Sequence, residues 1–162
     1  MKRLKSFILF LVFPLAAAGL IILNSTLAPR YYTSENEARI QYDAVLETAA
    51  EEMELQPGAV QAVPVKVRNQ GIGVWIPNEQ NDIALSYRVY DDNDGTQVLE
   101  GARTRLPHAV NPGEELDLTM ELKSPDKPGR YILVIDMVHE GKAWFADLGS
   151  QPLQVVLLVT GQ

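Results

Sequence analysis

From residue 57 onwards the sequence consists of short segments in which apolar and polar residues alternate, separated by Pro-Gly and Asp-Gly pairs. In residues 115–123 (ELDLTMELK), the leucines and Met120 fall on one side of an extended chain, and the charged residues fall on the other. Alternation of this kind predicts a half-buried strand, while Pro-Gly and Asp-Gly favour tight turns. We therefore expect antiparallel sheet with one face in water.

The alternating segments are numerous enough to predict a complete domain. Residues 131–139 (YILVIDMVH) are apolar on both faces except at Asp136, which is typical of a central strand. About eight short strands, with turns every 8 to 12 residues or so, indicate an all-β sandwich. Besides a strand before residue 57, we predict strands at 60–68, 83–90, 96–100, 115–123, 131–139, 143–146 and 153–160.

Residues 34–53 fit two patterns. Ser34 and Glu37 form a capping box, and apolar residues follow at helical spacing, which favours an amphipathic helix. From Ile40 to Leu46, however, apolar residues also alternate with polar ones, as in a strand entering a sandwich. We expect the strand.

The N-terminus has a different composition. Lys2, Arg3 and Lys5 precede residues 7–23, which carry no charge. A helix over residues 6–28 would be roughly 35 Å long at about 1.5 Å per residue, enough to cross a hydrocarbon core of about 30 Å. The predicted membrane-anchor residues are Phe7, Leu11, Phe13, Leu20 and Ile22.

A cleaved signal peptide is the alternative to an anchor, because the small residues at 16–19 or 26–28 could be cut by a peptidase. The apolar run is longer than a typical signal-peptide core. Arg30, Tyr31 and Tyr32 also resemble an interfacial belt at the headgroups. Retention is therefore preferred, with the lipid bilayer as a partner.

The basic N-terminus is expected to stay in the cytoplasm, which places the rest of the chain outside the inner membrane. In a Gram-negative cell this compartment is the periplasm. The predicted organisation is an anchor or signal peptide at 1–29, a tether at 30–39 and a sandwich at 40–162. The protein would be single-pass.

Charge and cysteine content exclude several functions. After residue 30 the chain carries 10 basic and 21 acidic groups, a net charge of −11, which disfavours nucleic acid as a partner. The chain has no cysteine, and therefore no disulfide, thiolate metal site or acylated cysteine anchor.

A set of turn and aromatic motifs lies within residues 40–160. The motifs are 67–71 (VRNQG) with Trp75, 85–87 (LSY), 112–113 (PG), 128–131 (PGRY) and 139–141 (HEG) with Trp144 and Phe145. The combination resembles a bacterial immunoglobulin-like module found beside glycosyltransferases and polysaccharide-export proteins. That module is similar to the C-terminal sugar-recognising domain of O-antigen transporters and, more distantly, to the Trp-containing domain of the autophagy receptor NBR. The resemblance implies an immunoglobulin-like antiparallel sandwich whose motifs mark the fold and perform no chemistry.

Residues 91–94 (DDND) and the two histidines are the candidates for a metal or catalytic site. The acidic run does not match a calcium-binding loop, since Gln97 and Arg103 stand where Gly and Glu are required, so a solvated hairpin turn is expected. Asp136 and His139 are three apart on a strand and point to opposite faces. Phosphate loops and nucleophile elbows are also missing from the sequence. We predict no catalytic residue, metal or cofactor, and no enzymatic activity.

The aromatic residues could form a sugar-stacking platform or fill the core. Aromatic side chains at alternating strand positions usually belong to the core, which is the preferred interpretation. If some of them reach the surface, Trp75, Tyr90 and Trp144 are the predicted contacts for a ligand or partner.

Small size and missing chemistry favour a non-catalytic, membrane-anchored periplasmic accessory or scaffold subunit. Its partners would be other subunits of an integral membrane complex, such as a photosynthetic reaction-centre, light-harvesting or respiratory complex. The alternative is a carbohydrate-binding or polysaccharide-export helper, for which carbohydrate is the partner. A third hypothesis is a chaperone-like module that offers residues 153–160 as a sheet edge.

Overall fold

The computed structural model describes residues 41–77 and 82–161 of the chain. Within these ranges no helix is both long and apolar enough to cross a membrane. The predicted anchor and tether stay predictions, because Phe7, Leu11, Phe13, Leu20, Ile22, Arg30, Tyr31 and Tyr32 lie outside the described residues.

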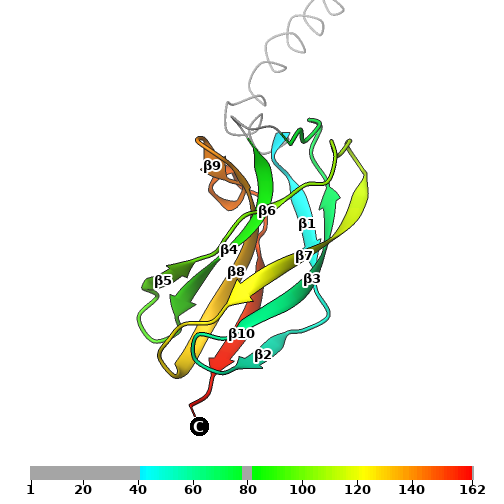
Figure 1. Cartoon of the computed structure of the whole chain (residues 1–162). Helices are drawn as coiled ribbons and strands as arrows, with labels where there is room; N and C mark the ends of the chain where they lie inside the picture. Colours follow the sequence, from blue (N-terminus) through cyan, green and yellow to red (C-terminus); the bar gives the residue numbers. More distant parts are fainter. Residues whose placement is uncertain (1–40, 78–81, 162) are drawn as a thin grey trace, which may run out of the picture. The chain divides into compact units, whose positions relative to one another are not determined.

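The described residues form an all-β domain of two sheets that enclose one hydrophobic core (Figure 1). They contain ten strands, where the sequence predicts about eight, and one short 3-10 helix, η2. The elements are β1 (Ala44–Glu47), β2 (Glu52–Leu55), β3 (Val60–Asn69), β4 (Ile83–Asp91), β5 (Gln97–Glu100), β6 (Thr104–Arg105), β7 (Glu115–Lys123), β8 (Gly129–His139), β9 (Ala143–Trp144), η2 (Ala146–Leu148) and β10 (Leu153–Val159).

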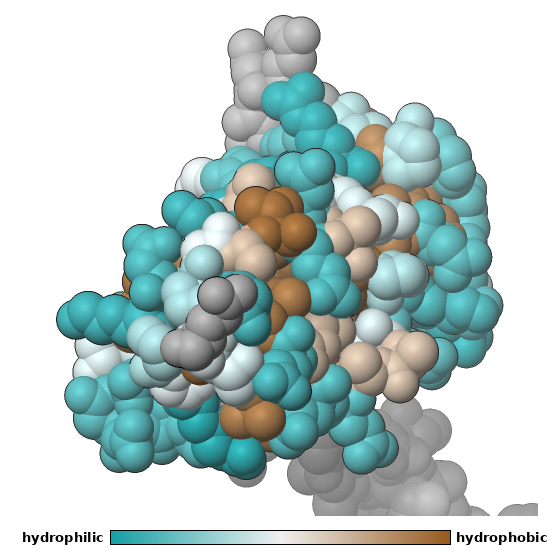
Figure 2. Space-filling view, turned by 60° about the horizontal axis from the view of Figure 1, so that its bottom comes forward, coloured by the Kyte–Doolittle hydropathy of each residue, from teal (hydrophilic) through white to brown (hydrophobic). Residues whose placement is uncertain are grey.

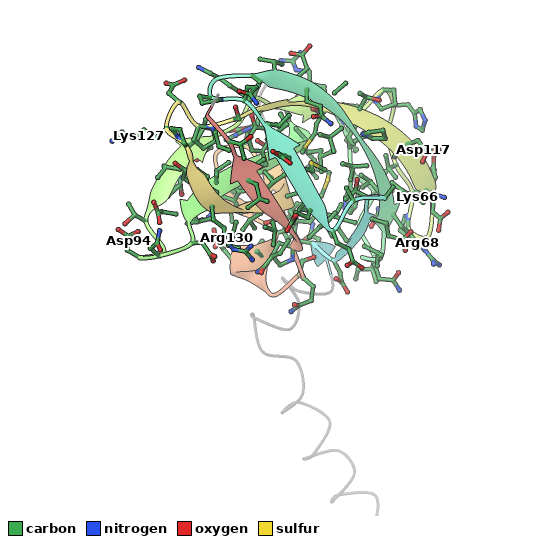
Figure 3. All side chains as sticks on the ribbon, turned by 90° about the horizontal axis from the view of Figure 1, so that it is seen from below. Lys66, Arg68, Asp94, Asp117, Lys127 and Arg130 are labelled. Atoms are coloured by element: carbon green, nitrogen blue, oxygen red, sulfur yellow. The ribbon has the colours of Figure 1, made fainter. Side chains whose placement is uncertain are left out.

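The smaller sheet has three antiparallel strands in the order β1-β3-β7. Its inward positions are apolar, with Val63, Val65 and Val67 of β3 at most 1% exposed. Its outward positions are mostly polar, and Figure 3 shows Lys66, Arg68 and Asp117 projecting from this sheet into solvent. The alternation predicted for residues 115–123 is confirmed.

The larger sheet has seven strands in the order β2-β10-β8-β4-β5, with β6 paired to β4 and β9 paired to β8. The predicted central position of β8 is confirmed, because β4 and β10 flank it. The sheet is not wholly antiparallel: β2 runs parallel to β10, with Glu52 opposite Val156. This pair departs from the predicted antiparallel sandwich.

Three local predictions need adjustment. Residues 41–53, the described part of the segment that fits two patterns, contain strand, as expected, but it is divided into β1 and β2 by residues 48–51. The strand predicted at 143–146 ends at Trp144, because the chain then turns into η2. Residues 153–160 are not a free sheet edge, since β10 pairs with β8 on one side and with β2 on the other.

Two tyrosines connect the core to the backbone. The amide of Lys123 in β7 donates a 2.8 Å hydrogen bond to the hydroxyl of Tyr87 in β4, which joins the two sheets. Burial raises the pKa of this hydroxyl, although the bond from Lys123 opposes the rise. In β8, the Tyr131 hydroxyl donates to the carbonyl of Lys127 at 2.9 Å. Both rings are buried.

Candidate functional site

The outward face of the seven-stranded sheet differs from that of the smaller sheet in pairing apolar side chains across neighbouring strands, whereas the exposed Val45 and Val60 of the smaller sheet lie opposite Arg68 and Lys123. Opposite residues of paired strands share a face, and the register places Val156, Ile132 and Tyr90 in one outward row, next to a row of Gln154, Val134 and Arg88. We call the half-buried apolar side chains of this face the outer patch: Tyr90, Ile132, Val134, Trp144, Val156 and Leu158.

Arg88 connects the two aromatic members of the outer patch. Its guanidinium carbon lies 3.9 Å from the centroid of a Trp144 ring, within the distance of a cation–π contact. The same guanidinium donates a 3.3 Å hydrogen bond to the Tyr90 hydroxyl. It also lies 3.8 Å from a carboxylate oxygen of Asp147 in η2. The arginine therefore holds Trp144 against the sheet.

Arg103, in the connection between β5 and β6, approaches the same indole at 5.0 Å. It forms ion pairs with Glu100, at 2.8 Å, and with Glu140. One of its nitrogens also donates to the hydroxyl of Ser86 at 3.0 Å. Burial opposes the charged form of Arg103, but hydrogen bonds and Coulombic attraction to the two glutamates outweigh it and raise its pKa. Arg103 therefore stays positively charged, and Glu100 and Glu140 balance its charge.

Asp136 fixes the loop that carries Trp144. Its two carboxylate oxygens accept hydrogen bonds from the amides of Met137 at 2.8 Å and Ala146 at 2.9 Å. The side chain is only 2% exposed. Desolvation raises its pKa to about 6, against the effect of the two amides and of Arg88. Asp136 is therefore a positioning residue that ties η2 to β8.

The three predicted contact residues lie in two different environments. Tyr90 and Trp144 belong to the outer patch, where Arg88 brings them together. Trp75 is 1% exposed, with its ring 5.5 Å from that of Phe145, and the Phe145 ring is 5.2 Å from that of Tyr42. Trp75 is thus a core residue, which no ligand can reach without opening the sandwich.

The acidic run at residues 91–94 and His139 form hydrogen bonds within the fold. Asp91 accepts hydrogen bonds from the amide and side chain of Asn93, and Asp94 accepts from the amide of Thr96, as in a hairpin turn. His139 is buried, with its Nδ1 atom 3.2 Å from the Tyr42 hydroxyl. It faces away from Asp136, which accepts a hydrogen bond from the amide of Ala146 after β9.

Sequence reasoning missed the two arginines and the four aliphatic members of the outer patch. A signal was present for Arg88, because alternation in β4 puts Ser86, Arg88 and Tyr90 on one face. A second signal was the two-sided apolarity of β8, which predicted cover for both faces. No local pattern predicts that Trp144 stacks on Arg88, which is 56 positions away in the sequence.

The outer patch combines aliphatic side chains with an indole and a phenol, and the guanidiniums of Arg88 and Arg103 lie against its indole. Surfaces of this composition are suited to contact with another macromolecule, since aromatic residues and arginine are enriched where proteins bind one another. Aromatic rings also stack on sugars, so the same chemistry would admit a glycan.

No protein-family model matches the chain, and the search of curated proteins found no match. Among solved structures, it is similar to a beta-glucosidase from Listeria innocua in complex with glucose, with 17% identity over 73% of this chain and 16% of that one, and a TM-score of 0.43. The sporulation control protein Spo0M from Bacillus subtilis shares 20% identity over 73% of this chain and 50% of its own, at a TM-score of 0.43. An ASH/PapD-like domain of human CEP192 shares 10% identity over 75% and 88%, at 0.35. The chain spans about a sixth of the glucosidase, and at these TM-scores the likenesses carry no inference about its function.

Proposed function

We propose that the chain is a non-catalytic, membrane-anchored accessory subunit whose sandwich lies outside the cytoplasm and docks, through the outer patch, on a larger membrane assembly. The anchor in this proposal is the apolar segment over residues 6–28. The sandwich is taken to be immunoglobulin-like, which is supported by the bond from Tyr131 to Lys127 near the start of β8, as in a tyrosine corner.

The difference between the two outward sheet faces carries the proposal. A solvated sheet face normally has polar residues at its outward positions, as the smaller sheet has in Lys66 and Asp117. On the larger sheet, β8 instead presents Ile132 and Val134, and β10 presents Val156 and Leu158. An apolar area on an outward sheet face is typical of a docking surface. The face of the molecule drawn in Figure 2 has small apolar areas among hydrophilic residues.

Purification from native membranes in a mild detergent, followed by mass spectrometry of co-migrating proteins, tests the proposal. We expect the wild-type chain to co-migrate with subunits of one assembly. The variant Ile132→Ser/Val156→Ser should lose at least nine-tenths of them, because its outer patch is interrupted. Recovery of the wild-type chain as a lone monomer would contradict the proposal.

A matched control uses the same chemical change on the smaller sheet. Val45 and Val60 are 40% and 64% exposed on β1 and β3. The variant Val45→Ser/Val60→Ser should keep the co-migrating subunits. Thermal unfolding of both double variants checks that each domain is folded, so that a loss of partners is assigned to the outer patch.

The carbohydrate alternative depends on one observation, the half-buried indole of Trp144 beside Tyr90 and Arg88. A sugar stacked on this indole would change its fluorescence. Titration with an array of bacterial glycans, using Trp144→Phe as the control, tests this second function. A spectrum that no glycan changes would exclude stacking at this position.

A further inference from the structure

The connection between β3 and β4 presents a row of aliphatic side chains. In residues 70–77 (QGIGVWIP), Ile72, Val74 and Ile76 are 72%, 45% and 55% exposed. Between them, Trp75 points the other way and is 1% exposed. We call Ile72, Val74 and Ile76 the aliphatic row. Val74 and Ile76 flank Trp75, which forms a bridge with Val110, and so share a side, while Ile72 precedes them at a bend.

The backbone that carries the aliphatic row is fixed to the domain. The buried side chain of Asn69 donates to the carbonyls of Gly73, at 2.8 Å, and Val110, at 3.0 Å, and accepts from the amide of Gly71 at 3.0 Å. Trp75 exchanges two backbone hydrogen bonds with Val110, of 3.0 and 2.9 Å. The row is therefore displayed in a fixed orientation, and no ordering of the loop is needed before it binds.

The aliphatic row lies at the end of the sandwich where the described chain begins (Figure 1). A Cβ atom placed on Gly73 would lie 3.2 Å from Cγ of Gln41, the first described residue. Residues 29–40 connect Gln41 to the predicted membrane segment. At about 3.4 Å per residue, these twelve residues reach at most about 40 Å even when fully extended. The row is thus at the end of the domain from which the chain leads back to the predicted membrane segment.

Charge distinguishes this loop from its surroundings. Residues 70–77 carry no charged side chain, although 22% of the chain is charged. The acidic sandwich is repelled by an anionic headgroup layer, so an uncharged loop with exposed aliphatic side chains can enter one at less cost than a charged loop. A second copy of the chain is a poorer occupant, because three side chains cannot supply the roughly 800 Å² per partner that a stable dimer buries.

We propose that the aliphatic row inserts into the headgroup layer of the membrane in which the N-terminal segment is anchored, and so sets the orientation of the sandwich. This inference rests on the anchor of the proposed function. Binding through three side chains would be weak for a free domain. The tether makes the contact intramolecular, so a small apolar area is sufficient to hold one orientation.

Single-cysteine variants offer a direct test, because the chain has no native cysteine. Ile72→Cys, Val74→Cys and Ile76→Cys are labelled with a polarity-sensitive dye, and the full chain is reconstituted in phosphatidylcholine nanodiscs containing a doxyl-lipid quencher. Val60→Cys is the matched control, since Val60 is 64% exposed at the opposite end of β3. We expect blue-shifted emission and at least twofold stronger quenching at positions 72, 74 and 76 than at position 60.

The outcomes separate this inference from the proposed function. If the chain fails to co-purify with nanodiscs, the anchor is wrong, and both proposals fall. If it co-purifies but the three dyes are quenched no more than the dye at position 60, lipid contact is excluded and the row remains free for a protein partner. Blue-shifted emission without lipid quenching would indicate contact between copies and would also overturn the inference. Unchanged thermal unfolding of each variant excludes misfolding as the cause.

Discussion

Gly101 lies directly against the ring of Tyr87, so closely that a Cβ atom at position 101 would overlap three carbons of that ring. The Gly101 amide also donates a 2.9 Å hydrogen bond to the Tyr87 carbonyl. The same tyrosine joins the two sheets through Lys123. A glycine therefore lets the connection between β5 and β6 pass over the residue that holds the sandwich together.

Replacement of Gly101 by Ala should lower the free energy of unfolding by about 1 to 3 kcal/mol, the usual cost of overpacking a core. Urea unfolding measures the change. The cause is checked by a double-mutant cycle with Tyr87→Leu, which removes the clashing ring. If Gly101→Ala costs as much in the Tyr87→Leu background, steric overlap with the ring is not the reason.

Replacement of Tyr131 by Phe removes the bond to the Lys127 carbonyl and leaves the ring in place. We expect a loss of about 1 kcal/mol in the free energy of unfolding. Tyr90→Phe is the matched control, because its hydroxyl lies in the half-buried outer patch and accepts a long 3.3 Å bond from Arg88. Equal losses in the two variants would show that the bond to Lys127 contributes no more to the free energy of unfolding than the bond between Arg88 and Tyr90.

Asp136 should make the domain less stable as the pH rises from about 4 to above 6. In the folded state its pKa is raised from 3.8 to about 6, so the folded chain keeps a proton that the unfolded chain releases. The contribution is present below pH 3.8 and is lost through this window, by roughly 3 kcal/mol at most. Urea unfolding of the wild type and Asp136→Asn at pH 4 and pH 7 should show that the stability difference between them shifts in favour of the variant at pH 7. A constant difference would refute the raised pKa.

His139 should act in the opposite direction. Burial lowers its pKa below 6.5, with a further contribution from Lys142, so the folded state favours the neutral imidazole. Stability linked to this group is present above pH 6.5 and is lost as the pH falls towards the folded-state pKa. Between pH 7 and pH 5, the wild type should therefore lose more stability than His139→Phe. The histidine resonances in NMR titration would report the lowered pKa independently.

The two tryptophans should be distinguishable by fluorescence. Trp75 is buried in the core, whereas Trp144 is half-buried beneath Arg88. In Trp144→Phe, only Trp75 emits, and we expect a blue-shifted spectrum that acrylamide quenches weakly. Arg88→Ala should uncover Trp144 and increase acrylamide quenching of the two-tryptophan chain. Strong quenching in Trp144→Phe would place Trp75 at the surface.

The strands that could be predicted are those in which apolar and polar residues alternate. In β7, the polar residues face solvent and the apolar residues between them face the core, so the local pattern is enough to predict the strand. Glu52–Leu55 forms a strand only because β10 lies beside it, and its partner Val156 is more than a hundred positions away. Such a pairing leaves no mark on the local sequence.

In the candidate site, too, contacts between distant parts of the chain could not be predicted from the local sequence. Residue type predicts Tyr90 and Trp144 as contacts, but the two arginines reach Trp144 only because β4 and the connection between β5 and β6 lie near β9 in space. Trp75 shows the converse: its flanking residues Val74 and Ile76 are also apolar, so alternation could not tell which of the three faces inwards. The structure assigns the inward position to Trp75.

The parallel pair of β2 and β10 has a consequence for the timing of folding. Because the two strands are so distant in the chain, their contact closes a very long loop, and folds dominated by such contacts typically form in milliseconds to seconds. Refolding followed by stopped-flow fluorescence should fall in this slow range. Because β10 is the last strand of the domain along the chain, the seven-stranded sheet cannot be completed before this strand is available to pair with both β8 and β2.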